Sequence, residues 1–177
     1  MRALVVYESM FGNTHCIADH LAEGLREDFE VVVVPVDGAT LDLVRSVDLV
    51  VVGGPTHAHG MTSSATRKSA VDMTTKDASL EMDSNAGGTG LRDWFQGLPP
   101  GHDTPAAAFD TRIDAPAMFT GAASHGIAKR LRKHGFRVVV DPMSFLVDKQ
   151  NHLLAGEAER AESWGRSVAA HVTSRVR

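Results

Sequence analysis

The sequence predicts an α/β fold in which helices cover both faces of a five-stranded parallel sheet. Short continuous apolar runs are typical of strands that are buried on both faces, and the chain has five of them, at 3–7, 31–34, 49–52, 106–109 and 138–140. Stretches in which apolar residues recur at helical spacing separate these runs, as in a chain of βα units. The 177 residues, 43% of them hydrophobic, are enough for a sizeable core. We therefore expect 1–177 to form a single domain.

The first helix is expected directly after the first apolar run. Ile17, Leu21 and Leu25 recur there every four residues, while acidic residues fall on the other faces, which is the pattern of an amphipathic helix. Asn13 or Thr14 is expected to cap its start, since both side chains can accept a backbone hydrogen bond there.

The later helices follow from the same spacing. A short helix is expected at 41–47, and a longer one carries Ile127 and Leu131 on its apolar face. Gly135 stands where the end of that helix favours a left-handed residue. A last helix near the C-terminus is expected to lay Trp164 onto the core.

Residues 61–89 interrupt this alternation and are interpreted as an insertion. Small and polar residues dominate the segment, and no strand run occurs in it. One or two helical turns are expected at 66–73, and a glycine-containing stretch leads into a helix bearing Trp94 and Phe95. Two interpretations stay open, a lid that shapes substrate specificity and a segment without a role in binding.

Composition excludes several classes of function. Lys and Arg number 18 against 22 Asp and Glu, and the net charge of −4 gives no electrostatic reason to expect nucleic acid as a partner. A single cysteine, Cys16, forms no internal disulfide and is typical of a reduced, cytoplasmic setting. The first apolar run is far too short for a signal-peptide core or a membrane span. We expect a cytoplasmic protein without membrane insertion.

The loop at 9–14 brings hydroxyls, an amide and backbone N–H groups to the start of the first helix. Such a helix N-terminus is a potential anion site, and because the loop has no Lys or Arg, a phosphate there would be held by neutral donors. No Gly-Lys-Ser or Gly-Lys-Thr follows a strand, and the glycine-rich dinucleotide fingerprint is absent from this loop. The alternative is that these residues only turn the chain and cap the helix.

The wider string from 5 to 21 resembles the phosphate-binding signature of flavodoxins at every position that the signature specifies. The matching residues are Val5, Val6, Tyr7, Ser9, Gly12, Thr14, Ala18 and Leu21. The resemblance implies a flavodoxin-like three-layer sandwich with strand order 2-1-3-4-5. Flavodoxins are themselves the standard example of a cofactor, FMN, in the crevice between the first and third strands of this order.

Two further loops extend the resemblance. Residues 53–60 resemble the Gly-x-Pro-Thr loop that lies against the isoalloxazine ring in flavodoxins and flavodoxin-like quinone reductases, and 109–112 with 121–124 resemble the loop on the ring's other side. The resemblance implies that the first loop holds the phosphate, the second flanks the ring and the third reaches its polar edge. The implied cofactor-binding residues are Ser9, Met10, Phe11, Gly12, Asn13, Thr14, Pro55, Thr56, His57, Ala58, His59, Gly60, Asp110, Thr111 and Arg112.

Two departures from ordinary flavodoxins lead to expectations of their own. Tyr7 is the only tyrosine and no tryptophan lies in a ring loop, so His57, His59 or Phe119 would have to replace the usual stacking residues. Losing two aromatic stacks would weaken FMN binding roughly tenfold to a hundredfold. Arg112 would place a cation near the ring, which predicts a less negative two-electron potential than that of a typical flavodoxin.

The function expected from these features is FMN-dependent electron transfer between a reductase and an acceptor protein. One alternative is an FMN-dependent quinone reductase or protoporphyrinogen-oxidising enzyme of the same fold, in which a loop histidine, His57 or His59, contacts the ring or donates a proton to a bound quinone. Others are a cofactor-free binding module and a related flavin or deazaflavin in place of FMN. A metal site at His57, His59 and His125 is not favoured, because no carboxylate or thiol completes the set. No catalytic residue is assigned.

Overall fold

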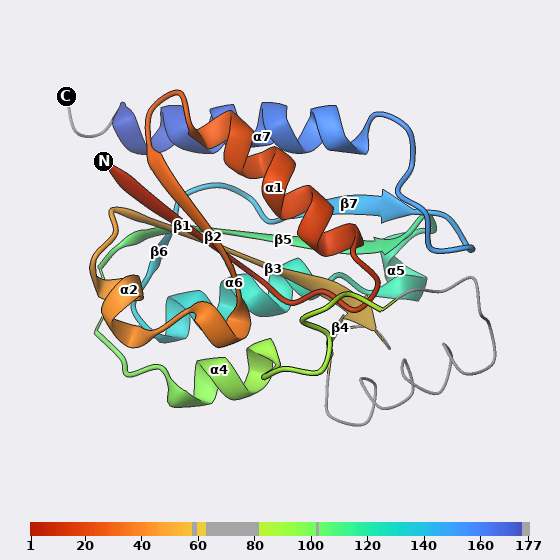
Figure 1. Cartoon of the computed structure of the whole chain (residues 1–177), viewed down its shortest axis with the longest axis horizontal. Helices are drawn as coiled ribbons and strands as arrows, with labels where there is room; N and C mark the ends of the chain where they lie inside the picture. The colour runs from red at the N-terminus through yellow and green to blue at the C-terminus, as the bar shows by residue number, and fades with distance from the viewer. Residues whose placement is uncertain (58–59, 63–81, 102, 175–177) are drawn as a thin grey trace.

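The computed structural model describes residues 1–57, 60–62, 82–101 and 103–174, which contain a seven-stranded sheet (Figure 1). The parallel strands run in the order β2-β1-β3-β5-β6, and β6 and β7 share the outer edge of β5. The predicted fold class and the order 2-1-3-4-5 are confirmed. The strands are β1 (Arg2–Tyr7), β2 (Glu30–Pro35), β3 (Leu49–His57), β4 (Gly60–Met61), β5 (Pro105–Ile113), β6 (Arg137–Val138) and β7 (Met143–Val147).

The strand count of five is corrected at two places. The short β4 pairs antiparallel with the end of β3, and its second residue, Met61, belongs to the segment in which no strand was expected. The last strand, expected at 138–140, is divided into β6 and β7, and β7 was not predicted. Pro142 lies between them and has no backbone N–H to donate, which interrupts the ladder before it resumes at Met143.

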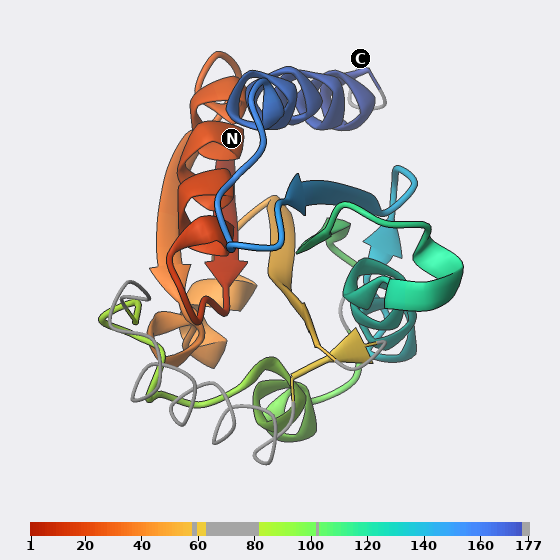
Figure 2. The same cartoon turned by 90° about the vertical axis from the view of Figure 1, so that its right-hand side faces the viewer.

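Helices cover both faces of the sheet, as Figure 2 shows in a view along a different axis. On one face α1 and α7 pack over an apolar cluster that contains Ile17, Leu21 and Trp164, and on the other face α2, α4 and α6 pack over a second cluster. The expected position of Trp164 is confirmed, because its ring meets Phe109 and Phe145 edge-on with centroids 6.4 and 6.2 Å away. The helices are α1 (Asn13–Leu25), η1 (Val36–Gly38), α2 (Leu41–Arg45), α4 (Leu91–Gly97), α5 (Ala117–Thr120), α6 (Ala123–Lys133) and α7 (Glu157–Thr173).

The start of α1 differs from the expected cap. Gly12 is the N-cap residue, with φ of +85°, and no side chain caps the helix. The amide of Asn13 donates instead to the carbonyl oxygen of Asn151 at 2.8 Å, and the hydroxyl of Thr14 pairs with that of Thr111 at 2.7 Å. Both side chains have long-range partners, so they are not available to the helix end.

The two ends of the insertion meet at one buried carboxylate. Thr62 donates its hydroxyl to Oε1 of Glu8, and the backbone N–H of Leu91 donates to Oε2 at 2.9 Å. Glu8 is only 7% exposed and directly follows β1, so the chain leaves and rejoins the core beside the same strand. The turns expected at 66–73 lie outside the described residues.

Candidate functional site

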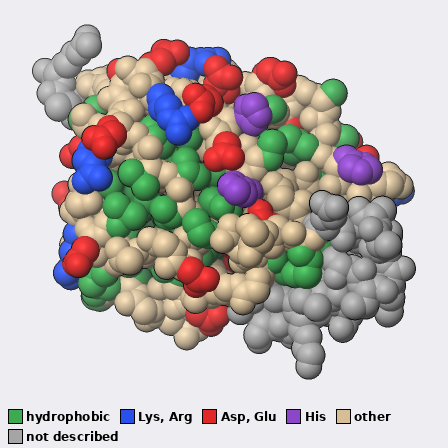
Figure 3. Space-filling model, in the orientation of Figure 1, with side chains coloured by type: hydrophobic (Ala, Val, Ile, Leu, Met, Phe, Trp, Pro, Cys, Tyr) green, Lys and Arg blue, Asp and Glu red, His purple; other side chains and the backbone are tan. Residues whose placement is uncertain are grey.

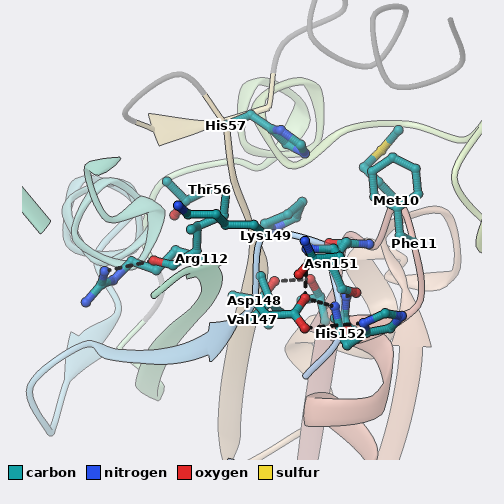
Figure 4. Close-up of a pocket in the computed structure, with 16 residues that line it drawn as sticks. Met10, Phe11, Thr56, His57, Arg112, Val147, Asp148, Lys149, Asn151 and His152 are labelled. Atoms are coloured by element: carbon teal, nitrogen blue, oxygen red, sulfur yellow. Dashed lines mark hydrogen bonds and ion pairs between the residues drawn. The ribbon is translucent and has the colours of Figure 1, made fainter. Parts of the chain in front are cut away.

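A cleft of about 600 Å³ opens at the carboxyl ends of β1, β3, β5 and β7. Figure 4 shows Met10 and Phe11 on one side of it and Thr56 and Arg112 on the other. This volume is in the range of sites for small molecules and cofactors. The lining residues are Met10, Phe11, Asn13, Thr14, Pro55, Thr56, His57, Thr111, Arg112, Ile113, Val147, Asp148, Lys149, Gln150, Asn151 and His152.

The first loop presents backbone donors without a nearby cation. Its shape is set by the positive φ of Gly12, whose N–H donates to the hydroxyl of Ser9 at 3.1 Å. The first intrahelical bond runs from Cys16 N to Gly12 O, so the N–H groups at 13–15 have no partner within the helix. The dipole of a 13-residue helix adds to these donors. The arrangement is suited to an oxyanion held by neutral groups.

The second loop begins inside β3, which continues through Pro55 and Thr56 to His57. All three residues line the cleft. The Nε2 atom of His57 is buried and has no hydrogen-bond partner among the described residues. Burial lowers the pKa of His57, and the negative charge of Glu8 opposes that shift only in part. His57 thus lines this part of the cleft with a pKa below its usual value.

The buried carboxylate of Asp110 holds the third loop in place. Oδ2 of Asp110 accepts from the Thr56 hydroxyl at 2.9 Å and from the backbone N–H of Ser124 at 2.8 Å. Asp110 has no exposed surface and is not part of the cleft lining. Its neighbour Thr111 lines the cleft and bonds Thr14, so the third loop is tied directly to the first.

Arg112 lines the cleft, but its guanidinium is bound to backbone and hydroxyl oxygens. Nη1 donates to the carbonyl oxygen of Ala115 at 2.6 Å, and it lies 3.3 Å from the hydroxyl of Thr120. No carboxylate of the described residues pairs with it, and its Nε is buried without a partner there. Its positive charge is therefore not neutralised by a described side chain.

Residues 147–152, after β7, form a fourth wall that the sequence analysis missed. Asp148 closes the turn by accepting from the backbone N–H groups of Gln150 and His152 at 2.9 and 2.8 Å. These bonds, the one from His152 first, hold the pKa of Asp148 below its usual value. Asn151 at the tip receives the Asn13 amide bond. The short apolar run 145–147 followed by polar turn residues was the signal for this wall, because a further parallel strand brings a further loop to the same edge.

The structure brings part of the predicted set together. Nine predicted residues line the cleft: Met10, Phe11, Asn13, Thr14, Pro55, Thr56, His57, Thr111 and Arg112. Four described ones do not line it: Ser9, Gly12, Gly60 and Asp110. Ala58 and His59 lie outside the described residues.

The aromatic side chains that line the cleft are Phe11, His57 and His152. Tyr7 is stacked on His15 with ring centroids 4.3 Å apart, and it is not part of the lining. Phe119, expected as a replacement for a stacking residue, is 68% exposed and does not line the cleft either. Of the three expected replacements, only His57 is described at the cleft.

The described residues contain neither a cluster of metal-binding side chains nor a helix that could span a membrane. No three His, Cys, Asp or Glu side chains within residues 1–57, 60–62, 82–101 and 103–174 gather as a metal site would need. No helix in these ranges is long and apolar enough to cross a membrane.

Comparison with known proteins places this geometry in context. The family model described as Flavodoxin matches residues 5–96. Among solved structures, the chain is similar to a flavodoxin from the domain Archaea (20% identity, 98% of this chain and 99% of that one, TM-score 0.65) and to oxidised flavodoxin 2 from Bacillus cereus (20%, 96% and 98%, 0.65). It is also similar to a WrbA-like protein from Agrobacterium tumefaciens (18%, 98% and 98%, 0.60). No curated protein matches the chain.

Proposed function

Because this chain belongs to the flavodoxin family, whose cofactor is FMN, we propose that it carries electrons from a reductase to an acceptor protein with FMN held in the cleft. The observation that carries the proposal is the position of the cleft at the carboxyl ends of β1 and β3, beside the N–H groups at 13–15, which have no partner within α1. FMN supplies the redox chemistry when bound, and the chain has to bind it, orient its ring and limit access of water.

The residues around the cleft fit the parts of this cofactor. The N–H groups at 13–15 and the hydroxyl of Thr14 would hold the phosphate, with no Lys or Arg in the loop. Pro55, Thr56 and His57 would flank the ring from β3. The Nε2 of His57, which has no partner among the described residues, supports this fit, because a buried polar nitrogen is costly unless another group satisfies it.

The first test is the visible spectrum of the purified protein, followed by titration with FMN while flavin fluorescence is recorded. We expect a flavin spectrum or saturable quenching. No binding at high micromolar FMN would contradict the proposal.

Thr14→Val tests the phosphate site itself. We expect it to weaken FMN binding about tenfold, because one hydrogen bond to a charged group is lost at nearly constant volume. Thr173→Val is the matched control, since Thr173 lies at the end of α7 and is not part of the cleft lining. Equal affinities for the two variants would remove Thr14 from the phosphate site.

A second candidate function, a quinone reductase of the same fold, is favoured by His57. His57 lines the cleft, where its imidazole could donate a proton to a quinone beside the ring. Oxidation of NAD(P)H with a small quinone discriminates the two candidates. Steady turnover by the protein alone would favour the reductase, whereas turnover only with an added flavodoxin reductase would favour the carrier.

A further inference from the structure

A second hollow, of about 360 Å³, lies between α4 and α6. It is lined by Arg92, Phe95, Gln96, Arg130, Lys133 and His134, none of which lines the cleft described above. We call it the α4–α6 hollow. Figure 1 shows both helices on the same side of the sheet.

The α4–α6 hollow gathers positive charge without acidic side chains. Three of its six lining residues are cations and none is Asp or Glu. No carboxylate of the described residues forms an ion pair with Arg92, Arg130 or Lys133, although other surface arginines are paired, such as Arg166 with Glu162. On the face that Figure 3 shows, by contrast, Lys and Arg are interspersed with Asp and Glu. The hollow is therefore a local region of positive potential on a chain whose net charge is −4.

The helix dipole accounts for only part of this charge. Arg130 and Lys133 lie in the last turn of α6, where cations are favourable. Arg92 lies in the first turn of α4, where a cation is unfavourable, and no helix-based reason places it beside Arg130. Burial first and Arg92 second lower the pKa of Arg130, as expected for two cations held close together.

Several donors of the hollow are held in place before any ligand arrives. Backbone carbonyls fix the Arg92 guanidinium, with Nη2 2.8 Å from Met61 O and Nε 2.8 Å from Thr62 O. The His134 ring stacks on Phe95 with centroids 5.9 Å apart, and its Nδ1 is buried without a partner among the described residues. Among the described residues, Arg130 makes one long bond, at 3.5 Å to Gly126 O, so most of its N–H groups have no described partner.

We propose that the α4–α6 hollow is a second binding site, for the phosphate group of a small molecule. Its donors come from α4, from α6 and from the residue that follows α6, so they approach a ligand from different directions. A phosphate offers more acceptor oxygens and more negative charge, about −1.5 to −2 near neutral pH, than a carboxylate, which has two oxygens and one charge. The hollow shares no lining residue with the cleft, so this proposal adds a second ligand to the FMN proposed above.

The test is an NMR titration. FMN is first added to the protein, inorganic phosphate is then titrated in, and the backbone amide signals are followed. We expect saturable shifts at 92, 95, 130, 133 and 134. Shifts at 12–15 instead would mean that phosphate binds in the first loop, which FMN should already occupy. Failure of FMN to bind is therefore distinguishable from failure of the α4–α6 hollow to bind phosphate. Absence of saturable shifts at α4 and α6 would overturn the proposal.

Matched variants distinguish a specific phosphate site from non-specific electrostatic attraction of phosphate to the surface. Arg130→Gln and Lys133→Gln should each weaken phosphate binding at the hollow about tenfold. Lys129→Gln makes the same charge change on an exposed part of α6 that does not line the hollow, and it should leave the affinity unchanged. Equal weakening by all three variants would mean an adventitious ion only. Shifts at the hollow with an acidic peptide but not with phosphate would identify a docking surface and contradict the proposed small-molecule site.

Discussion

The hydroxyl of Thr56 and the carboxylate of Asp110 form a 2.9 Å hydrogen bond that joins the end of β3 to the end of β5. Both residues also bind the start of α6: Thr56 Oγ1 accepts from Ala123 N and Asp110 Oδ2 accepts from Ser124 N, each at 2.8 Å. Two loops of the cleft and one helix N-terminus are thus held by a single buried pair.

Loss of this bond should destabilise the protein. Thr56→Val keeps the volume but removes a donor to a fully buried carboxylate and an acceptor for Ala123 N. We expect the free energy of unfolding to fall by about 1–3 kcal/mol, measured by urea denaturation. The Thr173→Val control should stay within about 0.5 kcal/mol of the wild type. Wild-type stability of Thr56→Val would show that the pair does not hold the loops.

His57 should make stability depend on pH. Because burial lowers its pKa in the folded state below the usual 6.5, the unfolded chain takes up the proton first as pH falls. The free energy of unfolding should therefore be fully retained above pH 6.5 and decrease below it, until the pH passes the folded pKa. This single group contributes at most about 1.4 kcal/mol per pH unit.

His57→Gln should flatten that part of the profile, measured by urea denaturation between pH 5 and 7.5 in buffers of about equal ionic strength. His125→Gln, at an exposed position on α6, should leave the wild-type slope. Identical profiles for all three proteins would mean that His57 does not titrate differently on folding.

The crossing of α1 and α7 should not tolerate a larger residue. A Cβ atom on Gly165 would lie 2.3 Å from the carbonyl oxygen of Leu21, and one on Gly24 would lie 2.0 Å from that of Glu162. Helix propensity alone would make Gly165→Ala stabilising, yet the clash is with backbone. We expect a loss of about 1–3 kcal/mol in thermal or urea unfolding.

Gly97→Ala is the matched control for the helix crossing, because Gly97 ends α4 and a Cβ there meets nothing within 4 Å. It should be neutral or slightly stabilising. A stabilised Gly165→Ala would show that the two helices can separate without cost.

Arg112 should tune the cofactor. Arg112 lines the cleft and no described carboxylate pairs with it, so Arg112→Gln should make the two-electron potential more negative, by about 30 mV for 1.4 kcal/mol of lost stabilisation. Redox titration of the FMN-loaded protein measures it. Arg132→Gln, exposed on α6, makes the same charge change away from the cleft. An unchanged potential in Arg112→Gln would refute the role of Arg112.

Local patterns in the sequence predicted the α/β class and most of the parallel strands, whereas the strand order was implied by the resemblance to flavodoxins. Apolar runs that are buried on both faces identified the parallel strands, and the four-residue spacing of Ile17, Leu21 and Leu25 identified α1, since both signals depend only on which residues must leave water. The loop motifs after β1 and β3 indicated the position of the cleft, because the carboxyl ends of parallel strands share one edge of the sheet.

Tertiary structure decided the features that depend on contacts between distant residues. The cap of α1 could not be predicted, because Asn13 and Thr14 bind Asn151 and Thr111, which are far away in sequence. Asp110 was expected at the cleft surface, yet its partners Thr56 and Ser124 hold it in the interior. The wall at 147–152 and the cations of the α4–α6 hollow likewise come together only when the strands and helices pack. Hydrophobic periodicity depends only on residues that are close in sequence. Hydrogen-bond partners and neighbouring charges depend on how the strands and helices pack.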